Sequence, residues 1–123
     1  MILVDTSVWV AHLRAGDERL SALLDSGGVL AHPFVIGELA LGYLRRRDAF
    51  LDDLRDLPRA GVATDDDVLQ FIERQSLFGR GVGYVDAHLL AAARLTPEAK
   101  LWTYDRNLQR VAAELDLAAM PSH

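Results

Sequence analysis

Short aliphatic runs alternate along this chain with stretches whose apolar residues recur at helical spacing, and this alternation constrains the fold most. A strand that is buried on both faces of a parallel sheet reads as a continuous apolar run. Such runs occupy Ile2–Val4, Val29–His32, Gly61–Thr64 and Leu101–Tyr104, with a short edge strand expected at Leu117–Met120. Strands that alternate with helices predict an α/β fold with a parallel sheet and helices on both of its faces.

The helices between these runs are predicted from capping residues and apolar spacing. Asp17 is an N-cap residue, Pro33 suits the first helical position, and Pro58 ends the helix before it. Thr6 and Ser7 are further cap candidates. The expected helices are Val8–Arg14, one after Asp17, Phe34–Arg46, Phe50–Leu57, one from Asp65, Val85–Arg94 and Asn107–Leu115, and the glycines at 79, 81 and 83 predict a loop over 78–84.

Length and charge narrow the function classes. The 123 residues suit one domain, 1–123, and contain no cysteine, which excludes disulfides and thiolate chemistry. The apolar start of the chain is interrupted by Asp5 and has no basic flank, so we expect a strand rather than a signal or membrane segment, in a cytoplasmic protein. A net charge of −5 argues against a broad positive surface for nucleic acid, so any RNA contact must be local.

Two aspartates end predicted strands. Asp5 follows Ile2–Val4 and Asp105 follows Leu101–Tyr104. Ligands of open parallel sheets bind just beyond the carboxyl ends of the strands, which makes both residues site candidates. The structural alternative is turn or helix-cap chemistry, which aspartate performs often at such positions.

Two further carboxylates have apolar helical neighbours. Glu38 is surrounded at helical spacing by Phe34, Val35, Leu41 and Gly42, so its side chain is expected to face the protein. Asp86 begins a strongly apolar helix. The alternatives are a surface position for Glu38, and for Asp86 a favourable interaction with the helix dipole.

A single cleft would explain all four carboxylates together. Like charges a few ångströms apart repel strongly, which raises pKa values or recruits a cation. Hard divalent ions such as Mg²⁺ or Mn²⁺ prefer oxygen ligands. Such an ion lowers the pKa of bound water and stabilises an in-line displacement at phosphorus. Asp5, Glu38, Asp86 and Asp105 are therefore predicted to be catalytic metal ligands of a phosphoryl-transfer enzyme.

The sequence resembles the VapC-type PIN-domain toxins over essentially its whole length. The resemblance lies in four motifs in order: Ile2-Leu-Val-Asp-Thr-Ser7, Pro33-Phe-Val-Ile-Gly-Glu-Leu39, Tyr84-Val-Asp-Ala-His-Leu-Leu-Ala-Ala-Ala93 and Thr103-Tyr-Asp-Arg-Asn107. It implies a three-layer α/β/α sandwich with strand order 3-2-1-4-5. It also implies Mg²⁺- or Mn²⁺-dependent endonucleolytic cleavage of RNA, and neutralisation by a cognate VapB-type antitoxin.

The same resemblance implies supporting roles for nearby polar residues. Ser7 and Thr103 would hold the carboxylates through their hydroxyl groups. Many members have an acidic residue where this chain has Asn107, which weakens the case for a second tightly held ion. A neutral amide can still hydrogen-bond water or phosphate, so Asn107 is a further supporting site residue. Arg80 is a candidate phosphate contact, with a solvated loop arginine as the alternative. His88 could pair with a carboxylate or simply be packed, and Trp9 and Trp102 are expected in the core.

Two other functions stay open at this point. A phosphatase of the haloacid dehalogenase type also places an aspartate after the first strand, but it needs another aspartate where this chain has Ser7. A PIN-like module without catalytic activity would bind only a protein partner. A homodimer is also expected, because the helices Phe34–Arg46 and Phe50–Leu57 carry more apolar residues than a small sheet can cover.

Overall fold

A parallel sheet of three short strands runs through the middle of the protein. The computed structural model describes residues 1–119. Its strands are β1 (Ile2–Val4), β2 (Val29–Leu30) and β3 (Lys100–Trp102), in the order β2-β1-β3. Leu3 of β1 pairs with Leu30 on one side and Leu101 on the other. Because β1 is central and largely buried, the residue that follows it emerges at the middle of the sheet edge.

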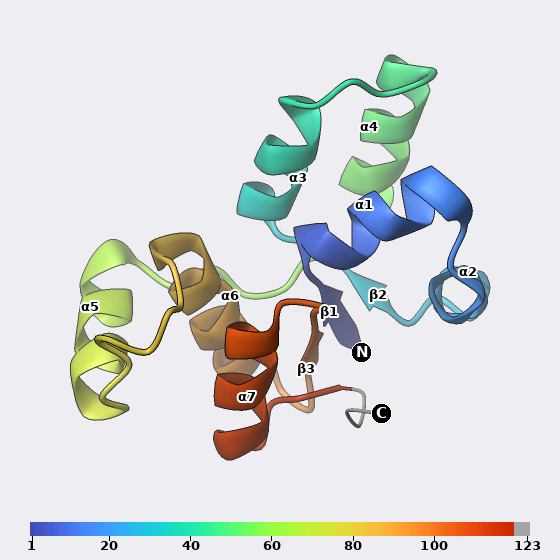
Figure 1. Cartoon of the computed structure of the whole chain (residues 1–123). Coiled ribbons are helices and arrows are strands. Elements are labelled where there is room, and N and C mark those ends of the chain that lie inside the picture. Colours follow the sequence, from blue (N-terminus) through green and yellow to red (C-terminus); the bar gives the residue numbers. More distant parts are fainter. Residues whose placement is uncertain (120–123) are drawn as a thin grey trace.

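Seven helices surround the sheet in the described part of the chain, and six of them form two groups. Figure 1 shows α1, α3 and α4 together on one side of the strands and α5, α6 and α7 together on the other. The helices are α1 (Thr6–Ala15), α2 (Glu18–Asp25), α3 (Pro33–Ala40), α4 (Arg47–Asp56), α5 (Asp65–Arg74), α6 (Tyr84–Leu95) and α7 (Arg106–Glu114). The predicted α/β class with a parallel sheet is confirmed.

The predicted strand order agrees with the structure for the three central strands. At the two edges of the sheet, the predicted outer strands are replaced by isolated bridges. The outer positions are single parallel bridges, Ala31 to Arg59 and Leu101 to Ala118. The predicted strand Gly61–Thr64 is wrong, because the Gly61 N–H donates to the Thr96 hydroxyl at 2.8 Å and the chain passes over the end of α6 there. For the predicted edge strand, Ala118 forms its bridge, and Met120 lies outside the described residues.

The predicted helix Phe34–Arg46 is two separate elements. Helix α3 ends at Ala40, and Arg46, in the left-handed region with φ 51°, leads into α4. Leu41 is 90% exposed, so no apolar contact stabilises a further turn there. Other boundaries follow the sequence signals: Pro33 opens α3, and the Asp17 carboxylate accepts the Arg19 and Leu20 N–H groups at the start of α2.

The core lies between the sheet and helix α6. Leu89 and Leu90 of α6 are fully buried beside the strands, as is Leu101 of β3. Trp9 and Trp102 are buried as predicted. Burial of a leucine side chain contributes roughly 1.5–3 kcal/mol, so this packing fixes the position of α6, whose first turn carries Asp86. None of the described helices combines the length and apolar character needed to cross a bilayer.

Candidate active site

Asp5 lies at the centre of the candidate site, between β1 and α1. Its side chain is only 6% exposed, and its Oδ2 accepts the Ser7 and Thr103 hydroxyls, both at 2.7 Å. These two bonds compensate for part of the cost of removing the carboxylate from water. The prediction that Thr6 and Ser7 cap α1 is wrong, because Asp5 occupies the cap position and both hydroxyls bond to carboxylates instead.

Residues 103–105 continue from β3 and complete the hydroxyl network. The Tyr104 N–H donates to the Ser7 hydroxyl at 3.0 Å, and the Asp105 N–H donates to the Thr103 hydroxyl at 3.0 Å. Because β1 and β3 are neighbours, their carboxyl ends meet at the same edge of the sheet. The network therefore fixes Asp5 and the backbone of Asp105 relative to one another.

Asp86 and Asp105 both accept a hydrogen bond at a helix N-terminus. Asp105 Oδ1 accepts the Leu108 N–H at 2.9 Å, and Asp86 Oδ2 accepts the Gly83 N–H at 3.1 Å. The capping interpretation is thus correct for Asp105, and Asp86 ties the first turn of α6 to Gly83. Each of these bonds ends on one carboxylate oxygen, so the aspartate can keep it and still offer the second oxygen to a cation.

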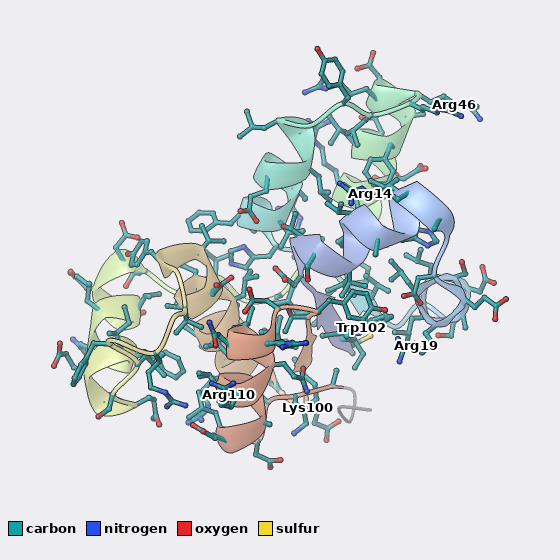
Figure 2. The ribbon with its side chains drawn as sticks, in the orientation of Figure 1. Arg14, Arg19, Arg46, Lys100, Trp102 and Arg110 are labelled. Carbon is teal, nitrogen blue, oxygen red and sulfur yellow. The ribbon has the colours of Figure 1, made fainter. Side chains whose placement is uncertain are left out.

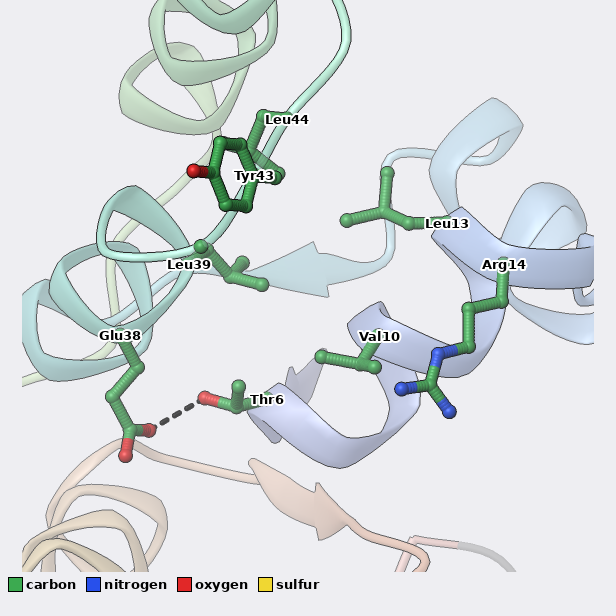
Figure 3. A pocket seen from close by; sticks show the side chains of 9 residues that line it. Thr6, Val10, Leu13, Arg14, Glu38, Leu39, Tyr43 and Leu44 are labelled. Atoms are coloured by element: carbon green, nitrogen blue, oxygen red, sulfur yellow. Dashed lines mark hydrogen bonds between the residues drawn. The ribbon is translucent and has the colours of Figure 1, made fainter.

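The surroundings of Glu38 differ from those predicted from the sequence. Its side chain is exposed rather than directed into the protein, because α3 ends at Ala40 and the apolar neighbour Leu41 is itself in solvent. The Thr6 hydroxyl donates to Glu38 Oε1 at 2.6 Å and joins α3 to α1 (Figure 3). Sequence reasoning missed Thr6 as a partner of Glu38, since a threonine after a strand is more often a cap.

The other three carboxylates lie within electrostatic range of Asp86. Burial is the main cause that raises the pKa of the Asp86 carboxyl above its usual value, and the Gly83 N–H opposes it. The negative charges of Asp5, Asp105 and Glu38 each raise the Asp86 pKa further. Residues from four distant parts of the chain therefore share one region of negative potential.

This region contains the type of oxygen ligands that a divalent cation prefers, but the side chains do not converge on one point. Among residues 1–119, no three histidine, aspartate or glutamate side chains converge closely enough to hold one ion. Mutual repulsion keeps like charges apart, and a cation removes that repulsion. The donor set consists of carboxylate oxygens, which suits Mg²⁺ or Mn²⁺, and burial together with three neighbouring negative charges raises the pKa of the Asp86 carboxyl.

Three other residues singled out from the sequence have protein partners. Arg80 forms an ion pair with Glu114, with 2.6 Å between Nη2 and Oε2. Asn107 donates its amide to the Gly81 carbonyl at 3.4 Å. His88 is packed, 2% exposed, and its Nε2 lies 3.2 Å from Asp65 Oδ1, without the geometry of a hydrogen bond. His88 therefore faces Asp65 rather than one of the four carboxylates.

Sequence reasoning also missed the contacts of Tyr104. Its hydroxyl bonds to Asp17 Oδ2 and accepts the Arg19 guanidinium at 3.0 Å. The Arg19 guanidinium lies over the Trp102 ring, 5.3 Å from its centroid, and Figure 2 shows the two residues side by side. These contacts tie the segment that precedes Asp105 to the start of α2.

A groove of about 350 Å³ opens beside Glu38, between α1 and the segment that joins α3 to α4. Figure 3 shows Thr6 and Glu38 at one end of it and Leu13 and Tyr43 at the other, with the Arg14 side chain along α1. Its remaining lining residues are mainly apolar. The groove therefore joins the carboxylate region to an exposed apolar surface that includes Leu41 and Tyr43.

Comparisons with known proteins agree with this architecture. The family described as PIN domain matches residues 2–114. The chain is 50% identical over 118 residues to Ribonuclease VapC32 in two strains of Mycobacterium tuberculosis, a match that covers 96% of this chain and 95% of the relative. The crystal structure of FitAcB from Neisseria gonorrhoeae has the same fold, with a TM-score of 0.65 and 23% identity over 96% of this chain and 95% of that one. The chain therefore belongs to the PIN-domain family, in its VapC-type branch.

Proposed function

We propose that this protein is a divalent-metal-dependent endoribonuclease that hydrolyses RNA phosphodiester bonds, and that it acts as the toxin of a type II toxin–antitoxin pair. The 50% identity to Ribonuclease VapC32 over nearly the whole chain supports the ribonuclease activity. The observation that best supports the site assignment is that Asp5, Asp105 and Glu38 lie close enough to Asp86 for their charges to raise its pKa, beside the hydroxyl bonds that fix Asp5.

The four carboxylates have distinct tasks in this proposal. Asp5 is the rigid central ligand, because two hydroxyl bonds fix its orientation. Asp86 and Asp105 contribute from the starts of α6 and α7, where hydrogen bonds to the backbone hold them. Glu38 contributes from α3, and the exposure of its side chain leaves it able to orient water. Ser7 and Thr103 act through Asp5, by holding its carboxylate in place.

A bound Mg²⁺ or Mn²⁺ would supply charge stabilisation at phosphorus and a water molecule of lowered pKa. The protein's own contribution is the arrangement of oxygen ligands and the compensation of their charge. RNA must reach this site through local contacts, since the net charge of −5 argues against a broad positive surface. Arg80 remains a candidate for such a contact only if its ion pair with Glu114 opens.

The partners in this proposal are a cognate VapB-type antitoxin and a second copy of the chain. The exposed apolar side chains of Leu41 and Tyr43, next to the groove that begins at Glu38, support a protein partner on that face. A partner that covers the groove would also restrict access to Glu38. The substrate class implies a cytoplasmic place of action, which is part of the proposal.

Cleavage of RNA by the purified chain, separated from any antitoxin, tests the proposal. We expect cleavage with Mg²⁺ or Mn²⁺ and none with a chelator. Asp5→Asn should lower the rate about a hundredfold or more, because metal-assisted charge stabilisation is worth several kcal/mol. Asp25→Asn, an exposed aspartate at the end of α2, removes the same charge and should cleave like the unmodified protein. Unchanged cleavage by Asp5→Asn would refute the assignment.

The same experiment separates the alternative functions. A phosphatase of the haloacid dehalogenase type would form a phosphorylated Asp5, but the position two residues later holds Ser7, whose hydroxyl donates to Asp5. A binding module without catalytic activity would bind its protein partner but would neither cleave RNA nor bind Mn²⁺.

A further inference from the structure

The loop that precedes α6 is attached to α7 at two points. We define residues 78–83 as the glycine loop. The Asn107 side-chain amide donates to the Gly81 carbonyl at 3.4 Å. Gly81 has φ +79°, and a Cβ atom there would lie 2.5 Å from Asn107 Nδ2. The backbone of the glycine loop therefore rests directly on Asn107, in a conformation that favours glycine, and a Cβ at Gly81 would displace the Asn107 amide.

The second attachment is the ion pair of Arg80 with Glu114. Arg80 Nη2 lies 2.6 Å from Glu114 Oε2, and Glu114 is the last residue of α7. Asn107 and Glu114 are about two helical turns apart, so they lie on the same face of the helix. The pair is partly exposed and contributes little to the free energy of unfolding. Its effect is to fix where the loop lies along α7.

The glycine loop and α7 each lie next to a candidate metal ligand. On the loop side, the Gly83 N–H donates to Asp86 Oδ2 at 3.1 Å. On the helix side, Asp105 caps the first turn of α7 through the Leu108 N–H. Gly81 is two residues from Gly83, and Asn107 is two residues from Asp105. The Gly83 N–H orients the Asp86 carboxylate, so a shift of the glycine loop against α7 would change how this carboxylate points relative to Asp105.

We infer that Asn107 and the Arg80–Glu114 pair are positioning residues that set Asp86 against Asp105 for cation binding, and that neither touches the cation or the RNA. The inference rests on the proposed function, since it concerns the same cation site. It assigns to Asn107 a role in which its amide N–H is essential, whereas a metal ligand at this position would use an oxygen.

Mn²⁺ binding to the metal-free protein, measured by calorimetry, tests this role without reference to activity. We expect Asn107→Ala and Gly81→Ala to weaken Mn²⁺ binding about tenfold, the usual cost of losing a residue that orients a ligand. Asn107→Asp is decisive. As a positioning residue it loses the bond to the Gly81 carbonyl and should bind Mn²⁺ as weakly as Asn107→Ala, whereas a metal ligand would bind Mn²⁺ more tightly after this change.

Glu114→Gln separates the two roles of Arg80, and Glu73→Gln on α5 serves as its matched control. If Arg80 positions the loop, Glu114→Gln and Arg80→Ala should weaken Mn²⁺ binding by a similar factor, and the double variant should be no worse. If Arg80 contacts RNA phosphate, Arg80→Ala should raise KM and leave the Mn²⁺ affinity unchanged. Glu114→Gln should then leave KM unchanged. The second pattern would overturn the inference for Arg80.

Amide hydrogen exchange gives a second readout in the metal-free protein. We expect faster exchange at residues 78–83 in Asn107→Ala and unchanged exchange in the core helix α6 beyond its first turn. Unchanged Mn²⁺ affinity and exchange in Asn107→Ala and Gly81→Ala would overturn the inference while the proposed function stands. If the unmodified protein binds no Mn²⁺, the proposed function fails and this inference with it.

Discussion

Asp5 and Asp86 are carboxylates of the same region, but their surroundings give them different properties. Asp5 Oδ2 accepts two hydroxyl hydrogen bonds inside the protein. Asp86 Oδ2 accepts one backbone N–H, and burial together with three neighbouring negative charges raises the pKa of its carboxyl. Of the two, Asp86 is therefore the residue at which the lack of a compensating cation should be measurable.

The first prediction concerns the stability of Asp86→Asn as a function of pH. Because the folded-state pKa is raised above the usual 3.8, the ionised form is disfavoured in the folded protein. The resulting stabilisation is present below pH 3.8 and is lost as the pH rises through the raised value. Without divalent ions, Asp86→Asn should therefore unfold at a higher temperature than the unmodified protein at about pH 7, and this difference should shrink toward about pH 4.

Thermal unfolding in the presence of a chelator, followed by circular dichroism between about pH 4 and pH 8, makes this measurement. The side-chain amide oxygen that this substitution introduces can still accept the Gly83 N–H, so the hydrogen bond is matched. Asp25→Asn should show no comparable dependence on pH. A variant that is no more stable than the unmodified protein at neutral pH would disprove the electrostatic account of Asp86.

At the residue scale, the sequence selects the four carboxylates as candidates, but it does not predict the surroundings of each one. Asp5 and Asp105 follow from their positions at strand ends. The Ser7 and Thr103 hydroxyls both donate to the Asp5 carboxylate, as the family resemblance implies, whereas Asp105 meets Thr103 only through its backbone N–H. The expected interior position of Glu38 is wrong. Helical spacing shows which residues share a face of the helix with Glu38. Whether that face is buried depends on where α3 ends, at Ala40.

At the scale of elements, α7 connects the site to the fold, because its N-cap is also a candidate ligand. Asp105 accepts the Leu108 N–H, and Leu108 is fully buried beneath it. The position of the carboxylate is therefore set by the packing of the helix. A substitution at residue 105 can change the cap, the charge or both.

Two substitutions separate these effects. Asp105→Asn keeps a good N-cap, so its free energy of unfolding should stay within about 0.5 kcal/mol while RNA cleavage falls sharply. Asp105→Ala should lose cleavage and also about 1 kcal/mol of stability, since alanine cannot cap. Denaturant unfolding and a cleavage assay give both values. Equal stability of the two variants would show that the cap contributes nothing, and full cleavage by Asp105→Asn would exclude Asp105 as a ligand.

The helices are predicted more reliably than the outer strands, for a physical reason. Helix signals are local: Asp17 caps α2, Pro33 opens α3, and the glycines before α6 form a loop. A strand exists only through its partner, and the segment Gly61–Thr64 meets the end of α6 instead of β2. A short apolar run therefore cannot reveal whether a neighbouring strand is within reach.

At the scale of the whole molecule, an apolar surface next to the groove stays uncovered in the isolated chain. Leu41 and Tyr43 are almost fully exposed, and Leu13 lines the same groove as Tyr43 (Figure 3). Exposed apolar side chains in one area favour association with another protein. The proposed dimer and the proposed antitoxin would both gain by burying this surface.

The prediction at this scale uses the paired substitutions Leu41→Lys and Tyr43→Lys. Because both side chains are exposed, the free energy of unfolding of the protein should change by no more than about 0.5 kcal/mol. Self-association, or binding of the cognate antitoxin, should weaken markedly, as measured by light scattering and calorimetry. Leu69→Lys on α5, at a position that is 53% exposed, is the control. Unchanged mass and unchanged antitoxin affinity would place the interface elsewhere.

The central claim is that four carboxylates from four parts of the chain form one cation site. Calorimetric titration of the metal-free protein with Mn²⁺ tests it most directly, on the unmodified chain and on Asp5→Asn, Glu38→Gln, Asp86→Asn and Asp105→Asn. The account predicts that each of these four substitutions weakens Mn²⁺ binding and that Asp25→Asn does not. Mn²⁺ affinity that is the same in the unmodified chain and in all four variants would contradict it.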